Sequence, residues 1–396
     1  MRQTLVILAL VALGGCPTKA TKDNRRADEP APTSDARAEE ADEQVDPARQ
    51  REEGRHTVVF ADRTSQGYLL LVEGERPEVP RREALQELAR RKLAAAEDEP
   101  ELEILLELIG TEPSSAPRTL DERVANADPS KQPDLLGFHV DVLPVHGSEG
   151  VVSAELLTDP ILTRALDPAQ RASLARRRWA ILLRADYRNQ NAVRGLRLLQ
   201  TLVRIVAVEH DALIHDPDIG ETVDEAIFTQ RRLRSTLGNV ADQVAVVPFP
   251  DPAHPQHVRL STRGMRRFGS VDLELGGLPP DPAVLQQATH LVHGLAHQMV
   301  RLGEYDSSGY AVELDPVVTI AHEDVARAYA GQSSQPPRCQ SCPGRVDVHL
   351  VERDPEPHDP SDHVVARIVA PRSLSDAPDY DHLAWARRAV TDLLGP

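Results

Sequence analysis

The feature that most constrains folding is a stretch near the amino terminus with almost no apolar side chain. Between residues 17 and 56 there is no Leu, Ile, Phe, Tyr, Trp or Met and a single Val, against 8 Lys or Arg and 11 Asp or Glu. Such a segment cannot bury enough apolar surface to offset the entropy of an ordered chain. We therefore predict a disordered linker over residues 16–56, and folded structure only from about residue 57 onward.

The residues in front of this linker are typical of an exported protein. Met1 and Arg2 precede the apolar run Leu5–Leu13, which is too short to span a bilayer but suits the core of a signal peptide. The tetrapeptide Leu13-Gly14-Gly15-Cys16 then resembles the lipobox of bacterial lipoproteins. That resemblance implies removal of the signal peptide 1–15, a diacylglycerol on the Cys16 thiol, and an acyl chain such as palmitate on the new amino terminus. An ordinary signal peptide with an incidental cysteine is the alternative.

A lipidated Cys16 would anchor the protein without spanning the membrane, because two or three acyl chains hold a soluble domain at a surface where one chain does not. Pro17 stands where an aspartate is associated with retention in the inner membrane of some bacteria. The resemblance therefore favours the outer membrane of the cell envelope. No other uncharged apolar run approaches the roughly 20 residues of a spanning helix, which excludes a polytopic membrane protein.

The charge balance excludes one class of partner. The chain carries 45 Lys and Arg against 62 Asp and Glu, which leaves a net charge of 45 − 62 = −17. Binding to phosphodiester backbones needs a concentrated positive field. We therefore expect no nucleic-acid partner.

The pattern beyond the linker predicts an α+β fold of two small helix-on-sheet domains. Residues 57–130 would form a small α+β domain and residues 131–330 a larger α/β domain. A loop rich in Pro, Ser and Cys would follow over 331–344, and the strands and helix of 345–396 would complete the fold. The first domain should begin with two strands, at 57–63 and 67–74, around a turn at Thr64–Gly67. A helix at 82–95 should follow, whereas 102–109 fits either a helix or a strand.

The larger domain shows a clearer periodic pattern of apolar residues. Residues 138–145 and 179–185 read as strands, 191–210 as an amphipathic helix and 212–215 as a strand, so that 179–215 forms a βαβ-like unit. Further strands are expected at 243–249, 257–262 and 271–275, and a second long helix at 282–302. The tail should contain strands at 346–351 and 363–370 and a helix at 381–394.

Between the last two strands of the larger domain lies Thr262-Arg263-Gly264-Met265-Arg266-Arg267-Phe268-Gly269. Together with the strand after it, this segment makes residues 179–300 similar to bacterial families known only as conserved domains of unknown function. The resemblance implies an α/β domain and brings no catalytic residues with it. The residues themselves indicate a strand, a turn that uses the freedom of Gly264 and Gly269, and a second strand, with Phe268 in the core.

Three histidines on the second long helix are the main candidate for chemistry. His290, His293 and His297 are spaced three and four residues apart, so they form one stripe opposite the apolar face. Neighbouring imidazoles at this spacing lie close enough to share a transition metal, and zinc is the candidate. No glutamate stands where the HExxH motif of metalloproteases has its general base. In a chain with 15 histidines a solvated polar face is the favoured interpretation of this stripe, and a pH-sensitive cluster is a third possibility.

Two cysteines form the other local signal. Cys339 and Cys342 are the pair that remains once Cys16 is assigned to lipidation, and an even number in an oxidising compartment favours a disulfide across their short loop. Zinc binding and redox activity are the alternatives, but the surrounding Pro- and Ser-rich sequence lacks the strand-to-helix context of a thioredoxin-type motif.

These features together predict an envelope lipoprotein that is held at the membrane through Cys16 and that binds or scaffolds an unknown envelope protein or ligand without catalysis or a cofactor. The alternative from another class is a metal-dependent hydrolase or redox protein that uses His290, His293 and His297 or the pair Cys339 and Cys342. An enzyme would bring such groups together in a concave pocket, whereas a scaffold has no need to.

Overall fold

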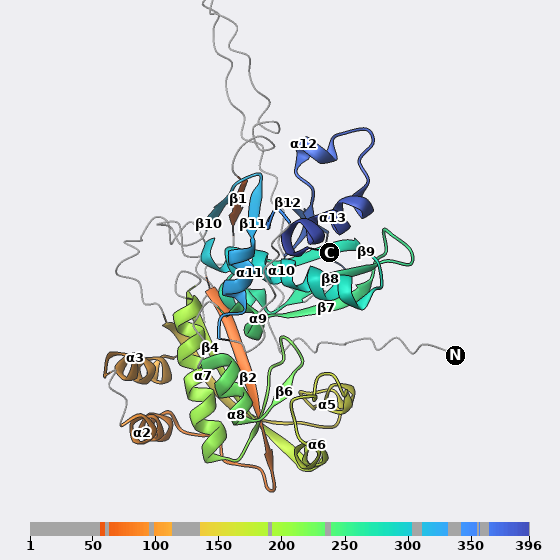
Figure 1. Ribbon diagram of the computed structural model, residues 1–396. Coiled ribbons are helices and arrows are strands. Elements are labelled where there is room, and N and C mark those ends of the chain that lie inside the picture. The colour runs from red at the N-terminus through yellow and green to blue at the C-terminus, as the bar shows by residue number, and fades with distance from the viewer. Residues whose placement is uncertain are drawn as a thin grey trace, which may run out of the picture.

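The computed structural model describes residues 56–59, 63–94, 99–112, 135–188, 192–233, 239–302, 311–331, 342–354, 356 and 364–395. The predicted signal peptide, Cys16, nearly all of the predicted linker and Cys339 lie outside the described residues. Helices and two large sheets share the described part, which confirms the α+β class (Figure 1). Within it, no helix combines the length and apolar composition that crossing a bilayer requires.

The first sheet has five strands in the order β3-β4-β2-β5-β6. At its centre lies β2 (Arg63–Glu73), which pairs antiparallel with β4 (Arg177–Arg188) on one side and with β5 (Leu213–His215) on the other. The edges are β3 (Leu135–Pro144) and β6 (Thr222–Val223). Because β2 precedes residue 130 and its sheet partners follow it, this sheet joins segments from both sides of the boundary that the sequence suggested.

The predicted turn at Thr64–Gly67 is wrong. These residues belong to β2, where Thr64 pairs with Tyr187 and Gly67 with Arg184. The strand before them, β1 (His56–Val59), pairs instead with β10 (Ala311–Leu314). The two apolar runs therefore do not form a hairpin, because each finds its partner far along the chain.

The βαβ-like unit is confirmed, with one strand inserted. Helix α7 (Ala192–Glu209) connects β4 to β5, and both strands run antiparallel to β2, so they are parallel to each other. On the same side of the sheet lie α2 (Arg82–Leu93) and α3 (Glu99–Gly110), while α5 (Ala154–Thr158) and α6 (Pro168–Ser173) lie on the other (Figure 1). Helix α3 decides the ambiguous segment 102–109 in favour of a helix.

Strand β2 is buried on both faces. Tyr68 and Leu70 join the large apolar core under α7, whereas Leu69 and Leu71 join a smaller core under the segment that contains α5 and α6. Successive side chains of a strand point to opposite faces. The uninterrupted apolar run of β2 therefore follows from cover on both sides.

The second sheet has six strands in the order β11-β12-β13-β9-β8-β7. The pair β13–β9 is parallel and the other pairs are antiparallel. Two long helices, α10 (Pro282–Leu302) and α13 (His382–Leu394), pack on it. The strands are β7 (Ala245–Pro250), β8 (Val258–Arg263), β9 (Asp272–Leu278), β11 (Val318–Ala321), β12 (Arg345–Arg353) and β13 (Val365–Val369).

Short elements complete the described chain. They are α8 (Glu225–Phe228), the π-helical turn Thr229–Leu233, α9 (Val240–Gln243), α11 (His322–Ala328), α12 (Arg372–Ser375) and the 3₁₀ helices Leu174–Arg176 and Met265–Phe268.

The 3₁₀ helix Met265–Phe268 connects the two sheets. It lies between Gly264 (φ 102°) and Gly269 (φ 67°), a left-handed backbone that favours glycine at both ends. Phe268 is 3% exposed in the core that both sheets share, which confirms its predicted place. From the first sheet, the Tyr187 hydroxyl donates to the Arg267 carbonyl oxygen over 2.9 Å. The segment that carried the family resemblance is thus a structural junction.

Candidate functional site

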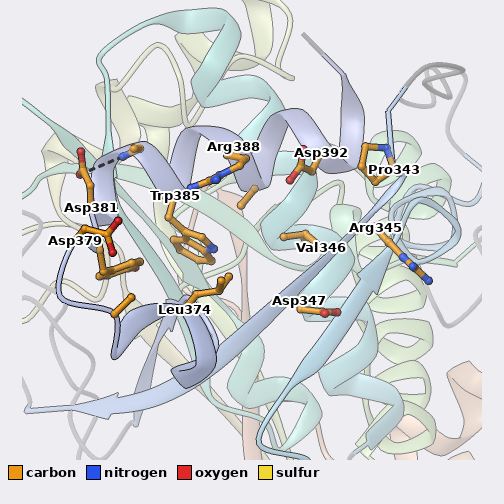
Figure 2. Close-up of a pocket in the computed structure, with 14 residues that line it drawn as sticks. Pro343, Arg345, Val346, Asp347, Leu374, Asp379, Asp381, Trp385, Arg388 and Asp392 are labelled. Carbon is orange, nitrogen blue, oxygen red and sulfur yellow. Dashed lines mark hydrogen bonds between the residues drawn. The ribbon is translucent and has the colours of Figure 1, made fainter.

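A groove of about 610 Å³ runs along α13, between this helix, the carboxyl-terminal segment around α12 and the start of β12 (Figure 2). Trp385 and Tyr380 supply its aromatic side chains, and Leu374 stands on its rim with 53% of its surface exposed. Figure 2 shows the Trp385 ring in the middle of the view, between α13 and Leu374. The groove thus combines an aromatic floor with an exposed apolar edge.

The sequence positions this floor through a capped amphipathic helix. The Asp381 carboxylate accepts hydrogen bonds from the backbone N–H groups of Leu383 (2.9 Å) and Ala384 (3.2 Å), which starts α13 at His382. Helical spacing then turns Ala386, Ala389 and Leu393 toward the sheet. Trp385 shares that buried side and is 4% exposed, so its ring is held rigidly where the groove begins.

Charges of both signs surround the floor. Two arginines, Arg345 and Arg388, and four aspartates line the groove. Arg345, Arg388, Asp379 and Asp392 form no side-chain hydrogen bond or ion pair within the described part of the chain. The other two aspartates already have partners. Asp381 caps α13, and Asp347 accepts a hydrogen bond from the Thr319 hydroxyl of β11. Four groups therefore keep their charges available to a ligand.

A cluster of polar rings lies behind Trp385. The His382 ring is 5.5 Å from that of Trp385 and stacks on His254 with centroids 5.5 Å apart and planes inclined by 18°. His382 Nδ1 and the Tyr380 hydroxyl are 3.0 Å apart. Burial, and next the neighbouring His254, lower the pKa of His382. The ring that supports the groove therefore favours its neutral form.

Asp251 binds His254, the histidine of this cluster that stacks on His382. Its Oδ2 accepts from His254 Nδ1 over 3.1 Å and from the Gly277 N–H over 2.7 Å. Burial raises the pKa of Asp251, but these hydrogen bonds outweigh it, so the pKa is lowered overall. The carboxylate thus orients His254 against His382.

The histidine stripe is buried, and the prediction of a solvated face is wrong for two of its members. His293 and His297 are each 5% exposed, because α11 and Tyr329 pack over this side of α10. His293 Nε2 donates to the Val244 carbonyl oxygen over 3.1 Å, which leaves Nδ1 to accept from the Tyr329 hydroxyl over 2.6 Å. His290 meets the same Tyr329 ring edge-on at 5.1 Å.

Both ring nitrogens of His293 are therefore used in hydrogen bonds within the fold. Burial lowers its pKa to about 4, so the ring is neutral near pH 7. A metal ion on Nδ1 would have to displace the Tyr329 hydroxyl. Among the residues that the structure describes, no three His, Cys, Asp or Glu side chains are grouped to hold a metal. Zinc at His290, His293 and His297 stays a prediction.

Cys342 is disulfide-bonded, and its partner lies outside the described residues. Its Sγ is 3.8 Å from the Leu393 carbonyl oxygen at the end of α13, next to Pro343 of the groove lining. The bond from Cys339 to Cys342 stays a prediction, because Cys339 itself is not described. Cys342 thus lies at the end of the groove.

Sequence reasoning missed a buried ionic cluster. Arg267 is fully buried and binds both carboxylate oxygens of Asp216, over 3.0 and 2.9 Å, while Arg232 lies 3.7 Å from the same carboxylate. No local pattern predicts this pair, since 51 residues separate its members. The groove was missed as well, although one of only two tryptophans on an amphipathic helix was a usable signal.

We compared the chain with protein-family models, curated proteins and solved structures. No protein-family model matches this chain, and no curated protein or solved structure shows significant similarity to it.

Proposed function

We propose that this chain is an envelope lipoprotein, anchored in the outer membrane through Cys16, whose folded part binds a ligand in the groove along α13 without catalysis. One observation carries the binding function: Arg345, Arg388, Asp379 and Asp392 surround a rigid Trp385 floor without engaging one another. Mostly apolar concave sites with a few charged groups are typical of ligand recognition. Because these groups form no hydrogen bond or ion pair within the described part of the chain, a ligand has to displace only water from them.

The lining favours a ligand that is partly apolar and cationic. Aspartates outnumber arginines four to two around the groove, so its local charge is negative. Trp385 and Tyr380 line the groove and Leu374 forms an apolar rim, and aliphatic side chains and cationic groups both bind beside such residues. A peptide segment of an envelope protein that alternates basic and aliphatic residues has this chemistry.

Tryptophan fluorescence tests the groove directly. The chain contains two tryptophans, Trp179 and Trp385. In a Trp179→Phe variant all tryptophan emission reports the groove. Titration with acetyl-Lys-Leu-Lys-amide should shift or quench this emission, whereas acetyl-Glu-Leu-Glu-amide should not. The double variant Asp379→Asn, Asp392→Asn should weaken binding of the basic peptide.

The matched control is Asp376→Asn, which removes an aspartate just beyond α12 that does not line the groove. It should leave the titration unchanged. An emission spectrum that stays constant under both peptides, or that responds equally to both, would contradict binding in this groove.

The anchor is tested at the mature amino terminus. Mass spectrometry of protein purified from membranes should find Cys16 as the first residue, carrying a diacylglycerol. A Cys16→Ser variant should keep its leader. Sucrose-gradient fractionation should place the wild type with outer-membrane markers. An uncut wild-type chain, or one released into buffer with a free Cys16 thiol, would rule out the anchor.

A further inference from the structure

Two histidines from distant parts of the chain stack on each other behind the groove. His254 belongs to the loop between β7 and β8, residues 251–257, and His382 is the first residue of α13. Their ring centroids are 5.5 Å apart, and their planes are inclined by 18°. We call this pair the histidine stack. Two neutral imidazoles pack in this way like other aromatic rings, whereas two protonated imidazoles repel each other.

The two rings of the histidine stack have hydrogen-bond partners of different kinds. His254 Nδ1 lies 3.1 Å from the Asp251 carboxylate, which compensates a proton on this ring. His382 Nδ1 lies 3.0 Å from the Tyr380 hydroxyl. Burial raises the pKa of Tyr380, so this partner is a neutral hydroxyl. Within the described residues no carboxylate forms a hydrogen bond with His382, so a proton on this ring lacks the compensation that His254 has.

The other charges around the stack also disfavour a proton on His382. The ring lies at the amino terminus of α13, where the helix dipole opposes a positive charge. Burial, and next the neighbouring His254, lower its pKa, and the attraction of Asp251 and Asp381 does not reverse this. The remaining ring near the stack, that of His257, meets His254 at 6.3 Å. The stack is therefore stable when neutral and accepts a second proton only against repulsion.

The surrounding backbone leaves no room for the two rings to separate in place. An added Cβ at Gly276 of β9 would lie 2.8 Å from Asp251 Oδ2, and one at Gly277 would lie 3.0 Å from His382 Cδ2. On another side, the His382 ring meets that of Trp385 with centroids 5.5 Å apart. Repulsion within the stack is therefore relieved by moving a segment of the chain.

The loop 251–257 is the segment best placed to move. It follows β7, which is an edge strand of the second sheet, and the His254 side chain is 31% exposed. Most of the other loop residues are exposed as well, namely Pro252, Ala253, Pro255 and Gln256. An exposed loop at a sheet edge opens at a lower free-energy cost than the core elements beside it. Departure of this loop takes away the ring that packs on His382, and His382 in turn supports the floor of the groove.

We propose that the histidine stack is a pH-sensitive switch: with neutral rings it holds the groove in its binding form, and with both rings protonated it releases the loop 251–257 and the Trp385 floor. A ligand bound near neutral pH is then released in mild acid. This consequence for the ligand rests on the proposed function of the groove, whereas the movement of the loop and of Trp385 does not.

Trp385 fluorescence tests the movement without any ligand. In the Trp179→Phe protein, the emission should shift to longer wavelength as the pH falls below 6.5, because the lowered pKa of His382 places its protonation there. His254→Phe and His382→Phe each keep an aromatic ring in the stack and remove one of the two charges. Each should abolish the shift, and the pair keeps the test valid if one variant does not fold.

His257→Phe is the matched control, because this ring belongs to the same loop and forms no ring contact with His382 within the described part of the chain. It should keep the shift. Hydrogen exchange adds a readout that local quenching of Trp385 would not change. The amides of Ala253 and His257 are hydrogen-bonded over 2.9 and 3.0 Å, so their protection should fall in the same pH range in the wild type and stay constant in His382→Phe.

Titration with acetyl-Lys-Leu-Lys-amide separates the switch from the groove. The peptide should bind at least about tenfold more weakly at about pH 4.5 than at about pH 7.5, and this ratio should disappear in His382→Phe, which retains the aspartates of the groove. Peptide binding with the same pH dependence in both proteins would overturn the switch and leave the proposed ligand site standing. Movement of Trp385 without any peptide binding would contradict the proposed function and support the switch. An emission spectrum that stays constant as the pH falls, or a shift that survives both His254→Phe and His382→Phe, would overturn the proposal.

Discussion

Asp216→Asn tests whether the buried ionic cluster holds the two sheets together. Asp216 lies in the loop after β5 of the first sheet, and Arg267 belongs to the 3₁₀ helix that precedes β9 of the second. The substitution keeps the shape of the side chain and removes its charge. Among the carboxylates that the structure describes, the fully buried Arg267 would then retain Asp218, whose Oδ2 is 3.5 Å from its Nη2.

The magnitude follows from this loss of compensation. Burial alone would lower the pKa of Arg267, but Asp216 raises it above its usual range, so the carboxylate keeps the guanidinium charged in the interior. Removing one partner of a buried pair costs about 3–5 kcal/mol, because the other charge stays buried without its counterion. Asp218 compensates in part, so we expect a loss of about 3 kcal/mol in the free energy of unfolding. Arg232, 3.7 Å from Asp216, adds to the cost.

Urea unfolding followed by circular dichroism measures this difference. Glu73→Gln is the control, because Glu73 pairs with Arg176 at 3.1 Å with side chains 40% and 62% exposed. Exposed pairs contribute about 0.2–1 kcal/mol, so this variant should unfold almost like the wild type. If Asp216→Asn lost no more stability than Glu73→Gln, the cluster would not hold the junction and our reasoning would be refuted.

Three further predictions follow from single side chains. Gly195→Ala should destabilise the protein although alanine favours helices, since the added Cβ would lie 2.4 Å from Tyr187 Cγ; a higher melting temperature would contradict this. His293 is neutral when folded with a pKa of about 4, whereas the unfolded ring takes up a proton near pH 6.5. Its contribution should therefore be complete above pH 6.5 and decline as the pH falls from 6.5 to about 4, and His293→Gln should flatten this part of the stability curve measured by urea unfolding at each pH. Arg82→Gln should cost about 2 kcal/mol in the same assay, because its guanidinium donates to the carbonyl oxygens of Ile109, Thr111 and Phe138, and the exposed Arg81→Gln should not.

Elements with a helical period were predictable almost to the residue. The expected helix at 282–302 is α10, and the expected helix at 381–394 is α13 within one residue. The apolar stripe of each helix is a local property that faces its sheet wherever the sheet comes from. The strands at 179–185 and 271–275 were likewise predictable from their apolar runs.

The partners of these elements were not predictable. The turn assigned to Thr64–Gly67 is part of β2 because the partner strand β4 continues to Arg188, so that Gly67 pairs with Arg184 and Thr64 with Tyr187. The stripe of His290, His293 and His297 was assigned to the correct face of its helix, but only the packing of Tyr329 shows that this face is buried. The groove depends on the same kind of information, since β12 and α13 lie side by side only in the folded chain.

The sequence by itself determined where apolar residues repeat, and hence the helices, the strands and the charged segment that precedes them. It also predicts lipidation at Cys16, because the resemblance of residues 13–16 to a lipobox is a property of a local peptide. Only the tertiary structure decided which charges meet: Arg267 with Asp216, and Arg259, Arg353 and Arg367 with Glu274. The periodic spacing of apolar residues is a local property of a short segment, whereas the energy of a buried charge depends on residues that only folding brings within a few ångströms.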